Sequence, residues 1–508
     1  MPKSDLRIDI LGTNLTISAE EEPEYLNTLL DKYRRTVENV QQKTGITDPL
    51  KTAVLTGFLL CDDLEKAGKT KAGQRAGEEP GEAEQLTLGM ISRLNEIVPD
   101  KVTVTIYKLH NTVKYHDWGS TEWIPALLGQ KNLSRIPWAE LWMGVNPSGP
   151  SLAVLPGGAK KPLSELINQA RENFLGKEIA QQYDTLPFLF KLLAAEKPLS
   201  IQAHPNHDQA KEGFDRENRK GIPLDAPDRN YRDDNHKPEI ICALSPFAAL
   251  CGFRKEREIC TLIEILSRFC EGNLKTSFNR LLSALKDESP LETFLARLYD
   301  LENETLKEAG AYIKTGLALL EKDFPEYKDE WELCMYLSSI YPGDPGIFAP
   351  LFLNIIELLP GEAIYVPAGV LHAYIRGLGI ELMADSDNVL RGGLTTKYVD
   401  VNELFRILEF SEYKPDIMKV PDPDPFYYSY PAPAGEFCLS VLHGKKDTAP
   451  YSEKGPSILL ITEGSATVTE SGKELILQTG ESVFIPTGKN LAFSGTFTAY
   501  TATVPGDL

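Results

Sequence analysis

The stretch "PGEAIYVPAGVLHAY" at residues 360–374 shares its spacing with the stretch "TGESVFIPTGKNLAF" at residues 479–493. Both contain the frame Gly-x5-Pro-x-Gly, and glycine and proline at these offsets fix a tight turn between two strands. A repeated frame predicts two β domains with the same local backbone. The first frame continues to His372, whereas the second has Leu491 at that offset. We therefore expect the first domain to hold a metal ion and the second to have lost that ability.

The frame that ends in His372 resembles the second motif of the cupins, which are small double-sheet jelly rolls. This resemblance implies a fold class that is mainly β with an α insertion, built on two cupin-like jelly-roll domains. The alternative is that both stretches are ordinary hairpins that share turn residues without sharing a fold.

The bulk composition limits the classes of function. At 508 residues the chain is too long for one core, so several domains are expected. A formal charge of -20 opposes binding to nucleic acid or to an anionic membrane, and an anionic substrate would need a local cationic pocket. No apolar run reaches bilayer length, and the opening "MPKSDLRIDILG" lacks the apolar core of a signal peptide. We therefore expect a cytoplasmic protein.

The first part of the chain predicts a hairpin followed by two helices. "LRIDILGTNLTIS" at residues 6–18 alternates apolar and polar residues and is expected to turn at Gly12-Thr13-Asn14. "DPLKTAVLTGFLLCDDLEKA" at residues 48–67 predicts the second helix. The first helix is predicted over residues 23–42, with one apolar stripe formed by Leu26, Leu29, Leu30, Tyr33, Val37 and Val40. So small a unit cannot bury both helices by itself, and self-association is expected.

Residues 6–67 resemble ZapA, a small protein that associates with the bacterial division ring. The resemblance implies a homodimer formed through this segment and a division-ring protein as partner. It ends at "KAGKTKAGQRAGEEPGEAEQ" (residues 66–85), where the family has a long coiled coil and this chain has a Gly-rich, charged stretch typical of a flexible linker. The alternative is a small dimerisation appendage with no role in division.

The remaining chain alternates between strand-like and helical patterns. Consecutive helical periodicities between residues 255 and 341 predict a helical insertion in a β protein. The expected domains are a ZapA-like unit (1–67), a flexible linker with a short helix (68–100), a catalytic cupin domain (101–254 and 342–415), the helical insertion (255–341), and a C-terminal degenerate cupin domain without metal (416–508).

Three short motifs supply candidate metal ligands. In "PLSIQAHPNHD" (198–208), Gln202 and His204 lie two positions apart, so both side chains share one face of a strand. In "NHKPEI" (235–240), Glu239 enters an apolar strand, where an unpaired carboxylate would be costly. With His372 these residues form a nitrogen and oxygen set that suits catalytic Zn²⁺. The alternative for the first motif is a surface turn.

From about residue 102 onward the chain resembles type I mannose-6-phosphate isomerase. The resemblance rests on seven ordered motifs: "YHDWGS", "AELWMGVNPSGPS", "PLSIQAHPN", "NHKPEIICAL", "ALCGFR", "VPAGVLHAY" and "DNVLRGGLTTKYVDV". It implies zinc held by Gln202, His204, Glu239 and His372. One departure is Asn146, where the family usually has His.

The resemblance implies interconversion of mannose 6-phosphate and fructose 6-phosphate through a cis-enediol, which feeds mannose and GDP-mannose metabolism. Such a site needs a proton carrier, a stabiliser of negative charge and a phosphate clamp. Glu381 and Asp387 are candidate proton carriers, and Arg391 and Lys237 are further candidate catalytic residues. Candidate substrate-binding residues are Ser200, Lys191, Lys397, Trp118 and Glu140; Lys191 is the weakest phosphate candidate, because a lysine at a strand end is usually solvated.

Other interpretations of the chain remain open at this point. A cupin metal oxygenase would use Fe²⁺ and more histidines, and Gln202 and the run "NVLRGGLTTK" disfavour it. A division-ring adaptor that carries an inactive isomerase domain is the non-enzymatic alternative. The other histidines are expected at the surface or behind the ligands: His110, His116, His207, His236 and His443.

Overall fold

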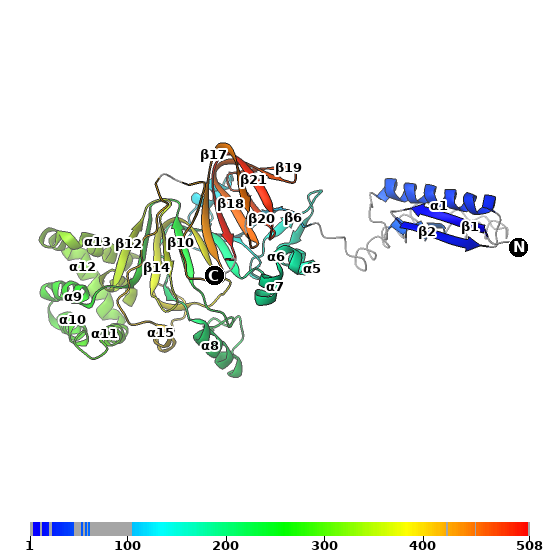
Figure 1. Cartoon of the computed structure of the whole chain (residues 1–508). Helices are drawn as coiled ribbons and strands as arrows, with labels where there is room; N and C mark the ends of the chain where they lie inside the picture. Colours follow the sequence, from blue (N-terminus) through cyan, green and yellow to red (C-terminus); the bar gives the residue numbers. More distant parts are fainter. Residues whose placement is uncertain are drawn as a thin grey trace. The chain divides into compact units, whose positions relative to one another are not determined.

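The computed structural model describes residues 4–10, 13–19, 23–44, 52–53, 56–57, 59–60, 104–422, 425–452 and 454–505. The chain divides into two compact units, Met1–Thr103 and Val104–Leu508, which are considered separately (Figure 1). Among the described helices, none combines the length and the apolar composition needed to cross a bilayer.

The N-terminal unit contains the predicted hairpin and first helix. Strands β1 (Ser4–Ile10) and β2 (Thr13–Ala19) pair in antiparallel fashion, and helix α1 (Pro23–Thr44) begins at the predicted proline. The predicted turn at residues 12–14 was wrong, because Thr13 and Asn14 already pair with Ile10 and Asp9 in the ladder. Threonine and asparagine occur both in turns and at the ends of strands, so their presence did not show that they belong to the strand.

One face of α1 is buried within the unit and another is left open. Leu26, Leu30, Val37 and Val40 are buried, whereas Leu29 is 47% exposed. The predicted single stripe is therefore divided between two faces of the helix. Part of the second predicted helix is described and is helical, over residues 52–53, 56–57 and 59–60. The linker predicted at 68–100 lies outside the described residues.

The larger unit contains two antiparallel sheets, in agreement with the cupin-like, mainly β fold class. The first sheet has the path β12-β11-β14-β8-β5-β4, and β10, β13, β9 and β15 join it through β14 and one another. Its strands are β4 (Thr112–Lys114), β5 (Glu140–Met143), β8 (Phe188–Ala195), β9 (Ile201–Ala203), β10 (Glu239–Ala243), β11 (Phe247–Phe253), β12 (Leu353–Leu358), β13 (Ala363–Val366), β14 (His372–Ala384) and β15 (Leu390–Gly393). β14 is the longest strand of this sheet, and it pairs with β8, β9, β10 and β11.

The second sheet has the path β16-β17-β21-β18-β20-β3-β6-β7, with β19 paired to β18. Its strands are β3 (Tyr107–His110), β6 (Leu152–Val154), β7 (Lys160–Pro162), β16 (Tyr427–Ser429), β17 (Cys438–Ser452), β18 (Ser457–Glu470), β19 (Lys473–Gln478), β20 (Ser482–Ile485) and β21 (Asn490–Thr503). Three of these strands come from the segment that the sequence assigned to the catalytic domain. β3 pairs with β20, so the second sheet is completed by strands from far upstream.

The repeated frame occupies equivalent places in the two sheets. His372 begins β14 in the first sheet, and Leu491 lies near the start of β21 in the second. Leu491 is 4% exposed and packs in a core cluster with Tyr451, Phe493 and Val468. A leucine fills this position with apolar contacts where the first sheet presents an imidazole.

The predicted helical insertion packs on the first sheet (Figure 1). It consists of α9 (Glu256–Phe269), α10 (Gly272–Ala284), α11 (Pro290–Tyr299), α12 (Asn303–Asp323), η1 (Pro325–Tyr327) and α13 (Lys328–Ile340), and it returns to the sheet through η2 (Pro345–Phe348) and α14 (Ala349–Phe352). α9 buries Ile259, Leu262, Ile263 and Leu266, the spacing of one helix face. This core continues to Ile201 beneath the candidate site.

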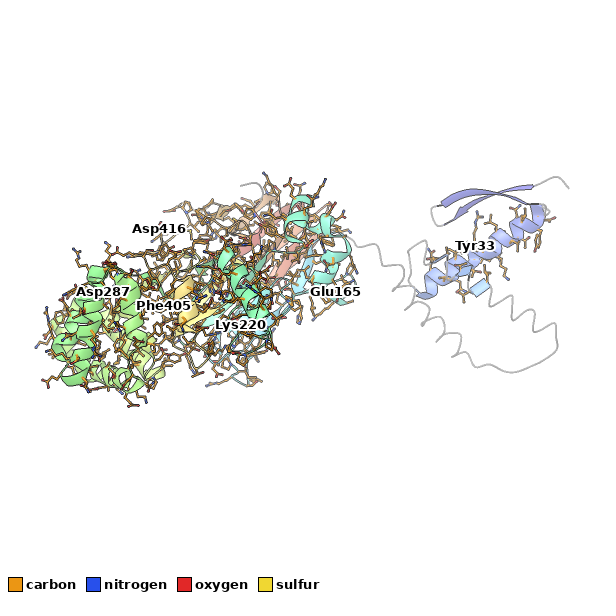
Figure 2. All side chains as sticks on the ribbon, turned by 90° about the horizontal axis from the view of Figure 1, so that it is seen from below. Tyr33, Glu165, Lys220, Asp287, Phe405 and Asp416 are labelled. Atoms are coloured by element: carbon orange, nitrogen blue, oxygen red, sulfur yellow. The ribbon has the colours of Figure 1, made fainter. Side chains whose placement is uncertain are left out.

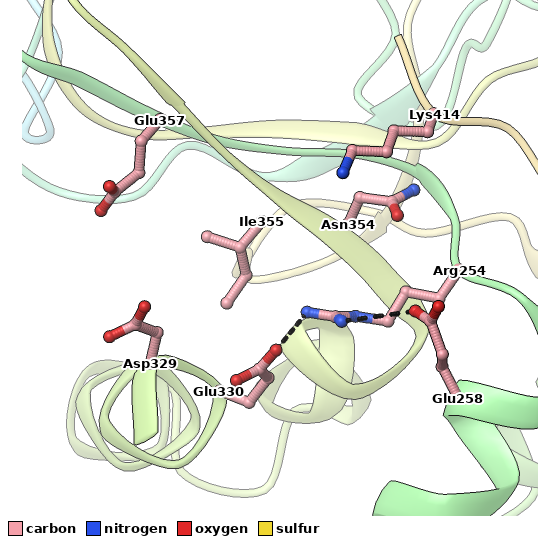
Figure 3. A pocket seen from close by; sticks show the side chains of 8 residues that line it. All are labelled: Arg254, Glu258, Asp329, Glu330, Asn354, Ile355, Glu357 and Lys414. Carbon is pink, nitrogen blue, oxygen red and sulfur yellow. Dashed lines mark hydrogen bonds and ion pairs between the residues drawn. The ribbon is translucent and has the colours of Figure 1, made fainter. Parts of the chain in front are cut away.

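Ion pairs also join the helical insertion to the first sheet. Arg254, which follows β11, pairs with Glu330 of α13 at 2.7 Å and with Glu258 of α9 at 3.8 Å (Figure 3). Beside it, the Asn354 amide donates to four backbone carbonyls, those of Cys251, Gly252, Phe253 and Tyr413. These contacts line a cavity of about 310 Å³ away from the candidate ligands.

The remaining described helices lie outside the insertion and have between 5 and 13 residues. α5 and the insertion lie at opposite sides of the larger unit, as Glu165 and Asp287 mark in Figure 2. These helices are α4 (Trp123–Leu127), α5 (Leu163–Gln169), α6 (Arg171–Leu175), α7 (Lys177–Tyr183), α8 (His207–Arg219) and α15 (Val401–Ile407). α8 starts with a complete capping box between Asn206 and Gln209, which fixes the chain just after His204.

Candidate active site

Strand β14 supplies two functional side chains, His372 and Glu381, which are separated by an odd number of positions, nine. In a regular strand, residues nine positions apart face opposite sides of the sheet. The ladder with β11 is interrupted between Tyr374 and Arg376, which pair with adjacent residues of β11 and leave Ile375 as an extra residue. Gly377 follows with φ 135°, and a Cβ there would lie 2.8 Å from the Phe247 Cα. This bulge brings Glu381 back to the face that carries His372.

Neighbouring strands bring the predicted ligands to that face. Gln202 on β9 lies directly between His372 on β14 and Arg391 on β15. Glu239 begins β10, which pairs with the other half of β14. His204, Glu239 and His372 are all buried, and they form the one group of potential metal ligands found among the described residues.

Both imidazoles are held in one tautomer by backbone carbonyls. The Nδ1 atom of His204 lies 2.8 Å from the Asn388 carbonyl oxygen, and that of His372 lies 3.0 Å from the Val370 carbonyl oxygen. A carbonyl oxygen only accepts, so each Nδ1 must carry the proton. Each Nε2 therefore presents a lone pair, which is the form that binds a metal.

The inward-facing atoms lack partners that would satisfy them. His204 Nε2 and Glu239 Oε1 are buried, lie 3.2 Å apart and make no hydrogen bond among the described residues, although Lys237 Nζ forms an ion pair with Glu239 Oε1. His372 Nε2 lies 3.4 Å from Glu239 Oε2. Lone pairs and a carboxylate that converge in this way repel one another unless a cation sits between them. The donor set therefore fits a metal ion that prefers nitrogen and oxygen.

The fourth predicted ligand, Gln202, lies at the same place. Its Nε2 is 3.3 Å from His372 Nε2. A half-turn about the last side-chain bond exchanges the amide nitrogen and oxygen, and the oxygen is the atom that can bind a metal. The structure therefore brings all four predicted ligands together.

The electrostatics of the cluster match this geometry. Burial opposes charge on Glu239, but Lys237 and the histidine ring nitrogens hold the pKa of its carboxyl well below the usual range. The Lys237 Nζ lies 3.2 Å from Glu239 Oε1. Burial and the nearby Lys237 lower the pKa of His204 to about 4. Near neutral pH, Glu239 is thus an anionic carboxylate and His204 a neutral imidazole.

A second charged row lies beside the cluster. The Lys191 Nζ lies 3.0 Å from Glu381 Oε2 and 3.3 Å from Glu140 Oε1, and all three side chains are buried. Lys191 is in the middle of β8, directly opposite Glu381, so its assignment to a solvated strand end was wrong. Burial raises the pKa of Glu381 despite Lys191. Burial also opposes charge on Glu140, but Lys191, His116 and Trp142 together lower the pKa of its carboxyl.

Three cations gather at the mouth. Burial and the neighbouring Arg232 lower the pKa of Arg391, and burial, Arg391 and Arg232 lower the pKa of Lys397. Within the described part of the chain, none of the three side chains forms an ion pair. Like charges that face one another without a counterion favour the binding of an anion. Arg232 was missed by the sequence analysis, because an exposed arginine in a polar loop has no distinguishing pattern.

One cavity of about 720 Å³ is bordered by Gln202, Glu239 and the charged residues beside them, whereas His204 and His372 lie behind its lining. The predicted residues that line it are Trp118, Glu140, Lys191, Ser200, Gln202, Lys237, Glu239, Glu381, Asp387, Arg391 and Lys397. His116 lines it as well, stacked on Trp118 with ring centroids 5.5 Å apart, although no sequence pattern placed this histidine there. An imidazole in the run "YHDWGS" looks like any exposed histidine.

Asn146 lies outside the ligand cluster and supports its surroundings. Its Nδ2 donates to Asp385 Oδ1 at 2.8 Å, and its Oδ1 accepts from the Ser148 backbone amide at 2.9 Å. Burial raises the pKa of Asp385 to about 6, and the nearby Asp387 and Asp233 add to the effect. The hydrogen bond from Asn146 therefore stabilises the ionised form of Asp385, which burial and the two neighbouring aspartates destabilise.

Family models match both units of the chain. The model for the catalytic domain of type I phosphomannose isomerase matches residues 106–256. The model for the cell division protein ZapA matches residues 6–101, beyond the segment ending at residue 67 that the sequence indicated.

Relatives and solved structures agree with the first of these matches. The chain is 38% identical over 381 residues to the mannose-6-phosphate isomerase of Escherichia coli, which covers 74% of this chain and 94% of that protein. The human mannose-6-phosphate isomerase is 32% identical over 413 residues, 76% of this chain and 95% of the relative. The structure of the Salmonella typhimurium mannose 6-phosphate isomerase bound to substrate and zinc has a TM-score of 0.72 and 34% identity, and covers 79% of this chain and 100% of that one.

The raised pKa of Asp385 predicts a pH-dependent effect of Asp385→Asn on stability. The folded protein binds this proton more tightly than the unfolded chain does, so stability is lost as the pH rises from about 4 to about 6. The variant lacks the buried charge and should be more stable than the parent at about pH 8, by at most about 3 kcal/mol. The difference should vanish at about pH 4.

Urea unfolding of the metal-free proteins at both pH values checks this prediction. Asp416→Asn, at an exposed position (Figure 2), is the matched control and should behave as the parent at either pH. If Asp385→Asn remained more stable than the parent by the same free energy of unfolding at about pH 4, the buried charge would not be the cause of the difference.

Proposed function

The chain belongs to the type I mannose-6-phosphate isomerase family, and from this premise we propose that it interconverts D-mannose 6-phosphate and D-fructose 6-phosphate through a cis-enediol. As a member of this family it is an aldose–ketose isomerase. The product would feed mannose and GDP-mannose metabolism. The observation that carries the proposal is a buried cluster of metal-binding atoms at the wall of a cavity whose mouth is cationic.

We assign zinc to the cluster. The solved mannose 6-phosphate isomerases that the chain resembles include zinc-bound ones, and two imidazoles with a carboxylate are typical zinc ligands. His204, Glu239 and His372 would hold the ion, and the Gln202 carbonyl oxygen would be the fourth ligand. When bound there, zinc supplies Lewis-acid stabilisation of negative charge on the sugar oxygens.

Two carboxyl groups are the candidates for moving the proton between C1 and C2. Glu381 is the stronger one, because burial raises its pKa and so brings it nearer to neutrality, where a proton carrier works best. Lys191, 3.0 Å away, would hold the Glu381 side chain in place. Asp387 at the cavity wall is the second candidate. Lys237 would stabilise negative charge on the substrate beside the ligands.

The phosphate is proposed to bind at the mouth. Arg391, Lys397 and Arg232 present three positive charges without acidic partners among the described residues, and a dianionic phosphate would relieve their repulsion. Ser200, Trp118 and Glu140 would form the walls around the sugar. We also propose that residues 101–254 and 342–415 form the catalytic domain.

Metal analysis combined with a coupled assay on mannose 6-phosphate tests the function. The parent should contain one zinc ion and turn over this substrate. Glu239→Ala and His372→Ala should lose both zinc and activity, because each opens the coordination shell. His110→Ala, at an exposed position, is the control and should keep both. Full zinc content and turnover in the Glu239→Ala variant would remove the ligand assignment.

The cationic mouth predicts a different effect. Arg391→Ala should keep zinc and fold but lose turnover by roughly 100-fold, since a charge that acts on the substrate is missing. Arg232→Ala should mainly raise KM, by roughly tenfold, with kcat nearly unchanged. Arg376→Ala is the matched control, because that side chain is exposed and pairs with Glu196. Parental kinetics for Arg391→Ala would contradict its role.

The N-terminal unit is proposed to make the enzyme a homodimer, with a division-ring protein as an additional partner. Tyr25 and Leu29 lie one turn apart on α1 and are 54% and 47% exposed. Exposed apolar side chains in such a row favour contact with another surface. The ZapA match over residues 6–101 supports a second copy of the same unit as that surface.

A chain that starts at Lys101 tests the role of this unit. It should fold, bind zinc and isomerise, because every proposed ligand and catalytic residue lies downstream of residue 101. Its mass by light scattering should correspond to fewer protomers than that of the full chain. Equal numbers of protomers would contradict dimerisation through the N-terminal unit, and loss of activity would contradict its independence.

A further inference from the structure

Asn388 is a fully buried polar residue next to the active-site cavity that does not itself line it. Its neighbours in sequence, Asp387 and Val389, are among the residues that line the cavity, and Asn388 has no exposed surface. The cavity is therefore reached by its neighbours and not by its side chain.

The Asn388 side chain holds the loop that leads to Glu239. Its Oδ1 accepts from the backbone amides of Arg232 at 2.7 Å and Asp233 at 3.3 Å. Its Nδ2 donates to the carbonyl oxygens of Asp233 and Asn235, both at 2.9 Å, and to Asp233 Oδ1 at 3.1 Å. Donor and acceptor halves of the amide are both used, so no other side chain of this size makes the same contacts.

The same residue holds a metal ligand through its backbone. The Asn388 carbonyl oxygen accepts from His204 Nδ1 at 2.8 Å. Around it, Asp233 accepts from the Asp387 backbone amide and from the Ser386 hydroxyl, both at 2.7 Å. The loop 385–388 is therefore attached to the loop 232–235 from both sides, and the position of the carbonyl follows from these attachments.

We propose that Asn388 is a positioning residue for the metal centre, which acts by fixing the carbonyl that sets the His204 tautomer. If the carbonyl moves, His204 Nδ1 loses its acceptor, and the proton can transfer to Nε2, where it blocks metal binding. The Asn388 side chain also accepts a hydrogen bond from the Arg232 backbone amide. The same residue therefore contacts both the loop of the proposed phosphate site and the metal ligand His204. This inference rests on the proposed zinc site.

Zinc affinity, measured by competition with a chelator, tests the proposal. Asn388→Ala should raise the zinc Kd by roughly 10- to 100-fold, the usual effect of removing a residue that orients a ligand. The cobalt(II)-substituted variant should show a changed visible absorption spectrum, because the His204 ring is no longer held in one orientation. At saturating zinc, KM for mannose 6-phosphate should rise less than in Arg232→Ala, because the Arg232 side chain is still present and only the hydrogen bond to its backbone amide is lost.

Ser386→Ala is a milder variant that keeps the experiment decisive if Asn388→Ala does not fold. It removes the hydroxyl that donates to Asp233 Oδ1 and the Asn235 carbonyl and accepts from the Asn388 backbone amide. Because the Asn388 side chain stays in place, the zinc Kd should rise less, in the same direction. Asn354→Ala is the matched control. That asparagine also donates to several backbone carbonyls, but it lies beside Arg254 (Figure 3), outside the ligand cluster.

The outcomes separate this proposal from the zinc site itself. Weakened zinc binding in the Asn388 and Ser386 variants, with parental affinity in Asn354→Ala, supports it. Parental affinity and an unchanged cobalt spectrum in both site variants overturn it, and so does an equal loss in Asn354→Ala, which would indicate general destabilisation. A parent that binds no zinc would instead contradict the proposed function.

Discussion

Glu239 carries a carboxylate with no exposed surface, and the metal-binding half of the molecule is organised around the balance of that charge. An unpaired buried carboxylate is among the most costly groups that a core can contain. Lys237 contributes one positive charge at 3.2 Å, and two imidazoles turn their unprotonated nitrogens toward the carboxylate. The charges of Glu239 and Lys237 offset each other, but unprotonated ring nitrogens still face carboxylate oxygens, and a cation between them would relieve this repulsion. Strands β9, β10 and β14 must therefore lie side by side, because each contributes one of the converging groups.

Charge is arranged in layers from the ligands to the solvent. Lys191 separates Glu140 from Glu381 in the interior, so that carboxylates and lysines alternate across the strands. The mouth instead contains Arg232, Arg391 and Lys397. The chain as a whole carries a formal charge of -20, so this rim is a local exception to the surrounding field. Such an exception can select a phosphorylated sugar over a neutral one at the entrance.

The sequence predicted the parts of the site that carry strong local signals. Gln202, His204, Glu239 and His372 were selected as candidate ligands because a ligand type stood out in an apolar or Gly/Pro-fixed context, and their side chains lie together in the structure. Arg232 and His116 were missed, since an exposed arginine or histidine looks the same whether it faces solvent or a cavity. Lys191 was misplaced because strand ends are poorly marked in an apolar run. The bulge at Ile375 was not foreseen either, and without it the odd spacing of His372 and Glu381 argues against a shared site. The helical insertion, by contrast, was predicted well, because its periodicity is long and local.

The crossing of β3, β6 and β7 into the second sheet has a consequence for synthesis on the ribosome. Lys108 pairs with Val483, about 375 residues later in the chain. At roughly 5–20 residues per second, the upstream strands wait about 20–75 s for the partner that covers them. During this interval the nascent chain presents open strand edges, which are prone to mispairing. Synthesis of β20, rather than completion of the metal-binding half, therefore sets the moment at which the enzyme can close its last sheet, and a chain truncated before β20 would remain a substrate for chaperones and proteases.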